Sequence, residues 1–204
     1  SITEMDGCSA RCWIYALLGL VMAGCGDSSQ SGAVPFHKQV SQAQQETDPE
    51  LRTIRLIRIG YQQGKAHDVA GAEATLQLAE KDCPQIKDLE SRTSALSMLA
   101  EAYLSIDRRS KALAAIDAAL TVASQVQQPE AKARALVRVA QAQGVLRDMN
   151  SARITLRLAE EVAASIEDTQ GHALVLCAIA GVYDQLGLRP ESSRVFQDGQ
   201  KYAD

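Results

Sequence analysis

Residues 89–105 read LESRTSALSMLAEAYLS, and residues 129–145, 40 positions later, read PEAKARALVRVAQAQGV. Both segments carry apolar or small residues three or four positions apart, which is the spacing of one face of an α-helix. Leu96 and Leu136 fall at the same place in the two segments, and Leu99 and Val139 follow three positions later. The two segments therefore predict equivalent helices in an internally repeated chain.

The repeat extends to four units at a constant offset of 40 residues, without an insertion or a deletion. The positions in register are Leu56, Leu96, Leu136 and Leu176; Ile59, Leu99, Val139 and Ile179; Gly60, Ala100, Ala140 and Ala180; Ala72, Ala112, Ala152 and Ser192; Leu76, Ile116, Leu156 and Phe196; and Ala79, Ala119, Ala159 and Gly199. Each unit predicts two helices, because a polar turn such as residues 107–109 divides it.

Composition agrees with packed helices. Of 204 residues, 46% are hydrophobic but only 4% are aromatic, so the core must be aliphatic and rich in alanine. The formal net charge of −4 argues against nucleic acid as a partner, since phosphate binding needs a concentrated basic surface.

The repeat resembles the tetratricopeptide repeat (TPR). The second unit supplies that family's spacing with Leu96, Leu99, Ala100, Tyr103, Ala112 and Ile116. The resemblance implies an all-α fold, a right-handed α-solenoid of about four two-helix repeats. The period departs from the family's 34 residues, and Gln63 and Gln143 stand where tyrosine is usual. A HEAT-like array, whose period is also about 40 residues, is the alternative.

The N-terminal region predicts a membrane anchor. Residues 13–24, WIYALLGLVMAG, are apolar and uncharged, but too few to span a bilayer as a helix. The tetrapeptide Met22-Ala23-Gly24-Cys25 resembles the lipobox of bacterial lipoproteins. This resemblance implies a signal peptide over 1–24, a lipidated Cys25, a flexible tether over 25–49 and a TPR-like domain over 50–204. Met5 is a plausible start. The alternatives are an uncleaved anchor or a core helix with a buried Cys25.

The sequence offers no catalytic set, metal site or cofactor motif. The three histidines, at 37, 67 and 172, lack metal-ligand spacing. Cys83 and Cys177 fall at packing positions, so a redox enzyme that uses either one is only a third hypothesis. We therefore expect a protein that is not an enzyme.

The TPR resemblance implies that the first helix of each unit lines a concave groove for a peptide or helix. In register, the predicted lining is Ile57, Arg58, Tyr61, Ser97, Met98, Glu101, Arg134, Val137, Arg138, Gln141 and Cys177. Its mixture of arginine and apolar groups suits a peptide of acidic and apolar character. The predicted function is a protein-binding scaffold of the bacterial cell envelope, lipid-anchored on the extracytoplasmic side. A self-associating structural module is the alternative.

Overall fold

The computed structural model describes residues 34–202, which form helices and connecting turns without a strand. The elements are α2 (Phe36–Gln44), α3 (Pro49–Lys65), α4 (Val69–Asp82), the short 3₁₀ helix η1 (Cys83–Gln85), α5 (Leu89–Ser105), α6 (Arg109–Gln125), α7 (Pro129–Val145), α8 (Met149–Ala163), α9 (Thr169–Gln185) and α10 (Arg189–Gln200). The predicted all-α class is confirmed for this part of the chain.

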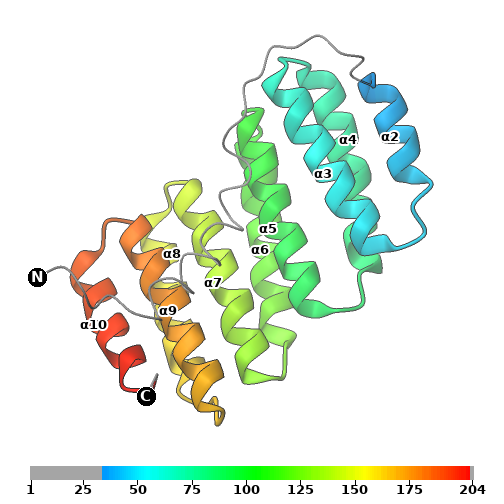
Figure 1. Cartoon of the computed structure of the whole chain (residues 1–204). Helices are drawn as coiled ribbons and strands as arrows, with labels where there is room; N and C mark the ends of the chain where they lie inside the picture. The colour runs from blue at the N-terminus through cyan, green and yellow to red at the C-terminus, as the bar shows by residue number, and fades with distance from the viewer. Residues whose placement is uncertain (1–33, 203–204) are drawn as a thin grey trace, which may run out of the picture.

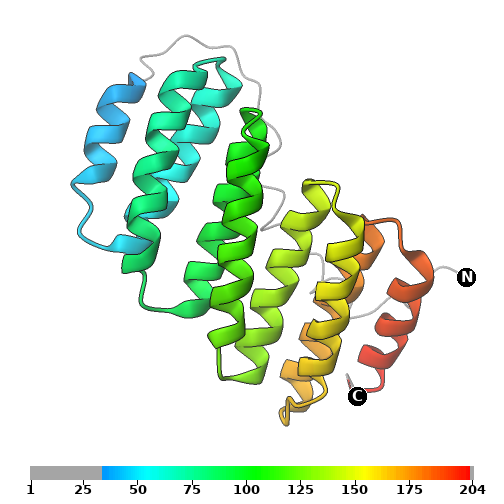
Figure 2. The same ribbon diagram turned by 180° about the vertical axis from the view of Figure 1, so that it is seen from behind.

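The helices form four pairs that follow one another along the molecule: α3–α4, α5–α6, α7–α8 and α9–α10. The first helices of successive pairs, α3, α5, α7 and α9, also contact one another in order. They face the viewer in Figure 1, and the second helices, α4, α6, α8 and α10, face the viewer in Figure 2. The molecule therefore has a first-helix face and a second-helix face.

The helix boundaries recur at 40-residue intervals because the same local signals recur. The first helices begin at residues 49, 89, 129 and 169, and the second helices at 69, 109, 149 and 189. Asp48, Asp88 and Asp168 each accept a hydrogen bond from a backbone N–H in the first turn of the following helix, as does Gln128 in the third pair. Such caps satisfy N–H groups that the helix itself leaves unpaired.

The turn inside each pair has one conformation throughout. His67, Asp107, Arg147 and Gly187 all have a positive φ, between 60° and 74°. The next residue donates its N–H to the carbonyl five positions earlier, for example Asp68 to Gln63 at 2.9 Å. This is a helix end in which a left-handed residue reverses the chain. Gly187 meets that demand without strain, whereas the other three residues carry a side chain there.

Helix α2 corrects the predicted tether over 25–49. Its Ala43 is 2% exposed, and Phe36 and Val40 pack against the core beside it. These three residues lie four and three positions apart, so they form one apolar stripe along the helix. They stand 40 positions before Leu76, Glu80 and Cys83 of α4. Helix α2 thus covers α3 in the register of a second helix.

The core is aliphatic and alanine-rich, as predicted from composition. Its largest fully buried side chains are Tyr103 and Tyr183, surrounded by leucine, isoleucine, valine and many alanines. The small residues allow close approach of the helices. Two clusters divide the core, and the division falls across α6 and α7. The first two pairs and the last two therefore each have a core of their own.

Candidate partner-binding surface

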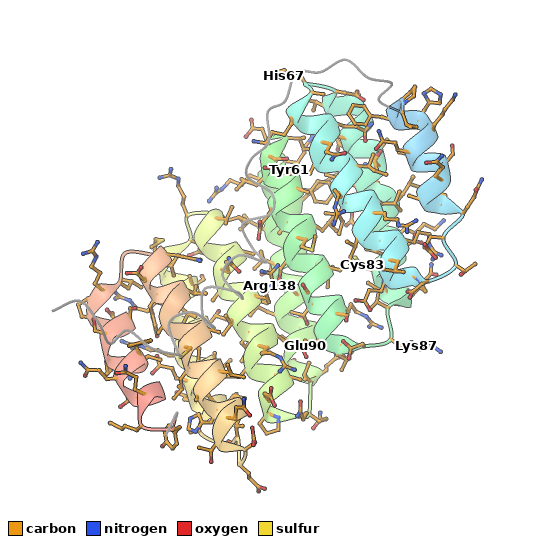
Figure 3. All side chains as sticks on the ribbon, in the orientation of Figure 1. Tyr61, His67, Cys83, Lys87, Glu90 and Arg138 are labelled. Atoms are coloured by element: carbon orange, nitrogen blue, oxygen red, sulfur yellow. The ribbon has the colours of Figure 1, made fainter. Side chains whose placement is uncertain are left out.

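Seven of the residues predicted to line a groove lie on the first-helix face with side chains that reach the surface. They are Arg58, Tyr61, Met98, Glu101, Arg134, Arg138 and Gln141. They come from three successive helices, α3, α5 and α7, and two of them, Tyr61 and Arg138, are labelled in Figure 3. The 40-residue register explains this, because equivalent residues of neighbouring parallel helices point the same way.

The other four predicted lining residues are buried and do not belong to this surface. Ile57 and Ser97 are 0% exposed, and Val137 and Cys177 are 7% and 5% exposed. They occupy one register position, at 40-residue intervals, that packs into the seams between neighbouring first helices. Their contribution is to the core, so a partner does not touch them in this structure.

Arg134 is occupied by ion pairs between neighbouring first helices. Its Nε lies 2.8 Å from a carboxylate oxygen of Glu90 on α5, and it also pairs with Glu130 one turn earlier on α7. The hydrogen bond from Glu90 is the main reason that the pKa of the Arg134 guanidinium is raised. This residue links α5 to α7, and less of its charge is available to a partner than that of Arg138.

The centre of the surface combines a buried charge with an arginine. Burial raises the pKa of the Glu101 carboxyl, and the charge of Arg138 partly opposes that shift. Among the described residues, no hydrogen bond or ion pair to the Glu101 carboxylate is found. Arg138 donates to the side-chain oxygen of Gln141 at 2.9 Å. A half-buried carboxylate without a donor favours a ligand that brings one.

The α3 end of the surface is aromatic and basic. Lys65 Nζ lies 5.3 Å from the centroid of the Tyr61 ring, within the range of a cation–π contact. Arg58 lies one turn before Tyr61 on the same helix and is exposed. Met98 of α5 adds a polarisable apolar group beside them in the register. This end therefore offers apolar contact and positive charge together.

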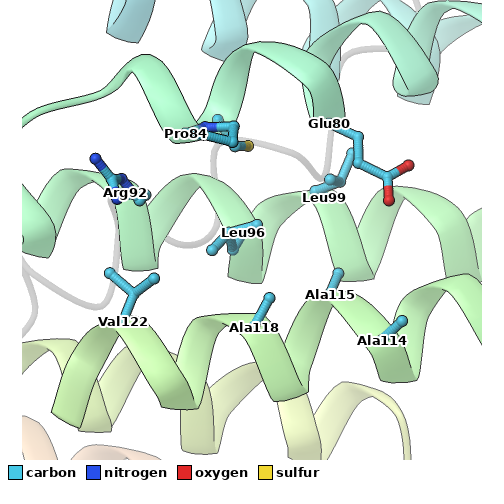
Figure 4. Close-up of a pocket in the computed structure, with 10 residues that line it drawn as sticks. Glu80, Pro84, Arg92, Leu96, Leu99, Ala114, Ala115, Ala118 and Val122 are labelled. Carbon is cyan, nitrogen blue, oxygen red and sulfur yellow. The ribbon is translucent and has the colours of Figure 1, made fainter. Parts of the chain in front are cut away.

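A hollow of about 280 Å³ opens between α4, η1, α5 and α6 (Figure 4). Leu96 and Leu99 of α5 line it, Ala114 and Ala118 of α6 form one wall, and Glu80 stands at its edge. The alanines leave the space open, because larger side chains at those two positions would fill it. The sequence carried a signal for this hollow in the two alanines, but the groove prediction concerned only the first helices.

The cysteines of the described region are buried. Cys83 lies beside the hollow, and burial raises the pKa of its thiol to about 12. A thiol that stays protonated at neutral pH is a poor nucleophile and a poor metal ligand. Within residues 34–202, no group of three His, Cys, Asp or Glu side chains could hold a metal ion. Nothing in the geometry of this region directs a reaction.

Two findings bear on the predicted anchor. In the described part of the chain, none of the helices has both the length and the apolar character that crossing a bilayer requires. Cys25, the predicted lipidation site, and residues 1–24, the predicted signal peptide, lie outside the described residues. The lipobox prediction thus stays a prediction.

Comparison with known proteins supports a fold and gives no function. The all-helical fold has a counterpart among solved structures. It is the crystal structure of Ton1535 from Thermococcus onnurineus NA1, which aligns at a TM-score of 0.60 and 12% sequence identity. The alignment covers 95% of this chain and 57% of that one, so this chain spans little more than half of its neighbour's length. No protein-family model and no curated protein matches the chain.

Proposed function

We propose that this chain is a membrane-anchored protein-interaction adaptor of the bacterial cell envelope, without enzymatic activity. In this proposal, the four helix pairs form a right-handed TPR-like α-solenoid, and the first-helix face binds a peptide or helix. The lipobox-like Met22 to Cys25 supplies the anchor, on the extracytoplasmic side of a membrane. The fold alone does not give this function, so the argument rests on the surface.

The observation that carries the proposal is the set of side chains on three successive first helices that packing leaves available. Tyr61, Met98 and Arg138 offer aromatic, apolar and cationic contacts, and Glu101 offers a half-buried carboxylate without a donor. Aromatic and arginine residues dominate binding energy in protein interfaces. A partner with acidic and apolar side chains, and with an N–H group for Glu101, fits this combination.

The test compares two arginines on opposite faces. The tagged full chain is solubilised from membranes as the parent, as Arg138→Glu and as Arg157→Glu, and the proteins that co-purify are identified by mass. We expect a partner recovered with the parent and with Arg157→Glu, and at least about tenfold less with Arg138→Glu, since a reversed charge in a binding site costs several kcal/mol. Equal recovery with all three forms would show that the first-helix face does not bind the partner.

The anchor is tested separately with Cys25→Ala, which cannot be lipidated. We expect this form to leave the membrane fraction after salt washing, while the parent stays, because stable anchoring takes more than one acyl chain. A Cys83→Ala form, which changes a cysteine in the described region, serves as the control. If Cys25→Ala stays in the membrane as firmly as the parent, the lipid-anchor part of the proposal is wrong.

A further inference from the structure

The second-helix face carries ion pairs between the first two pairs of helices. Glu73 of α4 lies 2.8 Å from Arg108, in the turn before α6, and 2.8 Å from Lys111 within α6. Its carboxylate therefore spans the boundary, and its pKa is lowered mainly by the hydrogen bond from Lys111. These groups are partly exposed, so their effect is to close this boundary with polar contacts rather than to add much stability.

The boundary between the last two pairs is closed in the same way. Arg153 of α8 lies 3.4 Å from Glu191 of α10, and Arg194 of α10 lies 2.8 Å from Glu160 of α8. Arg153 and Glu191 stand 80 positions after Glu73 and Lys111. The pair is thus repeated with its charges exchanged.

The central boundary, between α6 and α8, has apolar side chains at these positions. Leu113 of α6 stands 40 positions after Glu73, and Ile154 of α8 stands 40 positions before Arg194. In the part of the chain that the structure describes, no ion pair joins α6 to α8. The contrast is specific, because only this boundary has leucine and isoleucine where its neighbours have charges.

Leu113, Ile154 and Leu158 form an apolar strip along this boundary. Leu113 is directed toward α8, as Glu73 is directed toward α6 in the preceding pair. Ile154 and Leu158 are directed toward α6, because the equivalent Ala114 and Ala118 line the hollow beside α4. The three side chains are 40%, 68% and 43% exposed. Figure 2 shows the face on which α6 and α8 follow each other. Clustered exposed apolar groups of this kind mark interaction surfaces.

The charges beside the strip are complementary to themselves. Asp117 of α6 and Arg157 of α8 are exposed and stand 40 positions apart, so they lie at a similar height on neighbouring helices. A second copy related by a twofold axis parallel to these helices would place α6 of one chain over α8 of the other. Asp117 of each copy would then meet Arg157 of the other, around the paired apolar strips.

We infer that the α6–α8 face is the contact surface between two copies of this chain. This inference is independent of the proposed function, because it uses the second-helix face and leaves the first-helix face open. A dimer would present two first-helix faces directed away from the shared contact. The twofold arrangement makes a demand that an unrelated partner would not make, namely that Asp117 and Arg157 recognise each other between copies.

The experiment uses full-length chains with two different tags, produced together and solubilised mildly. Recovery of one tag through the other measures self-association. We expect Ile154→Asp to lower recovery at least about tenfold, since it places a charge in the centre of the apolar contact. The matched control is Leu51→Asp, which changes an exposed leucine of α3, 47% exposed, in the same way. Circular dichroism confirms that both variants are folded.

A charge exchange then tests the arrangement itself. Chains that all carry Asp117→Arg, or all carry Arg157→Asp, place like charges opposite each other, and we expect recovery to fall about tenfold. Mixing the two variants restores both opposite-charge contacts, so recovery should return to the parent level. The inference is overturned if the parent does not self-associate, if Leu51→Asp acts like Ile154→Asp, or if the mixed variants fail to recover.

Discussion

Tyr103 of α5 and Gln63 of α3 occupy the same place in successive helix pairs, but they connect the molecule differently. Both are buried, with 0% and 5% exposure. The Tyr103 hydroxyl donates to a carboxylate oxygen of Glu80 at 2.7 Å, which joins α5 to α4 of the preceding pair. The Gln63 side-chain oxygen accepts from the Thr75 hydroxyl at 2.7 Å, which joins α3 to α4 of its own pair.

The second half of the chain repeats this contrast. The Tyr183 hydroxyl donates to Glu160 at 2.7 Å, across the boundary before α9. Gln143 of α7 replaces tyrosine where the preceding second helix has Leu120 in the position of Glu80 and Glu160. Tyrosine thus stands where the preceding pair offers a carboxylate. The difference teaches that the pairs are linked two by two, in agreement with the two core clusters.

The largest expected effect comes from removing one of the linking tyrosines. Tyr103→Ala leaves a cavity at a fully buried aromatic, and we expect it to lower the free energy of unfolding by about 3–5 kcal/mol. Tyr103→Phe keeps the ring and removes the hydroxyl, so its cost should be about 0.5–1.5 kcal/mol. Urea denaturation followed by circular dichroism measures both. If the phenylalanine form lost as much stability as the alanine form, the hydroxyl bond rather than packing would dominate at this position.

A smaller effect separates the two glutamines. Thr75→Val removes the hydroxyl that donates to Gln63 and leaves a buried amide oxygen without a partner, at a cost of about 1–3 kcal/mol. Thr155 is the equivalent residue beside Gln143, but the Gln143 oxygen already has no hydrogen-bond partner among the described residues. Thr155→Val should therefore cost less in the same urea experiment. Equal costs for the two variants would mean that Thr155 donates to Gln143 in solution.

The sequence predicts the helical class and most helix boundaries because its signals recur locally. The capping residues before α3, α5 and α9 and the turns inside each pair lie at fixed 40-residue intervals, and each needs only its own neighbourhood. The short helix expected over 36–45 is also present, but its packing against α3 was not predicted. The Ser- and Gln-rich composition around it resembles a tether, and only the register of Phe36, Val40 and Ala43 with α4 could have corrected this.

The candidate surface was predicted less well, for a geometric reason. Ile57 and Arg58 are consecutive, as are Ser97 and Met98, and a helix turns only about 100° between them. Periodicity alone does not say which member of such a pair faces solvent when neighbours pack on both sides of the helix. The tyrosine links had a readable signal, since Glu80 and Tyr103 recur as Glu160 and Tyr183, but a single 40-residue unit does not reveal an 80-residue pattern.

The last prediction uses the ionisation of the linking tyrosines. Burial, followed by the hydrogen bond to Glu80 or Glu160, raises the pKa of Tyr103 and Tyr183 well above the ordinary value of about 10. Above about pH 10, these phenols lose their protons in the unfolded chain but keep them in the folded chain. The unfolded state then binds fewer protons, so the free energy of unfolding must fall as pH rises.

Each linking tyrosine should therefore make the stability fall by up to about 1.4 kcal/mol per pH unit above about pH 10. Urea denaturation at a series of alkaline pH values measures this slope, and phenolate absorbance shows when the buried tyrosines ionise. Replacing both by phenylalanine should flatten the slope, whereas Tyr202→Phe, which changes an exposed tyrosine, should not. An unchanged slope in the double variant would mean that Tyr103 and Tyr183 ionise freely in the folded chain, and that their bonds to Glu80 and Glu160 do not link the pairs.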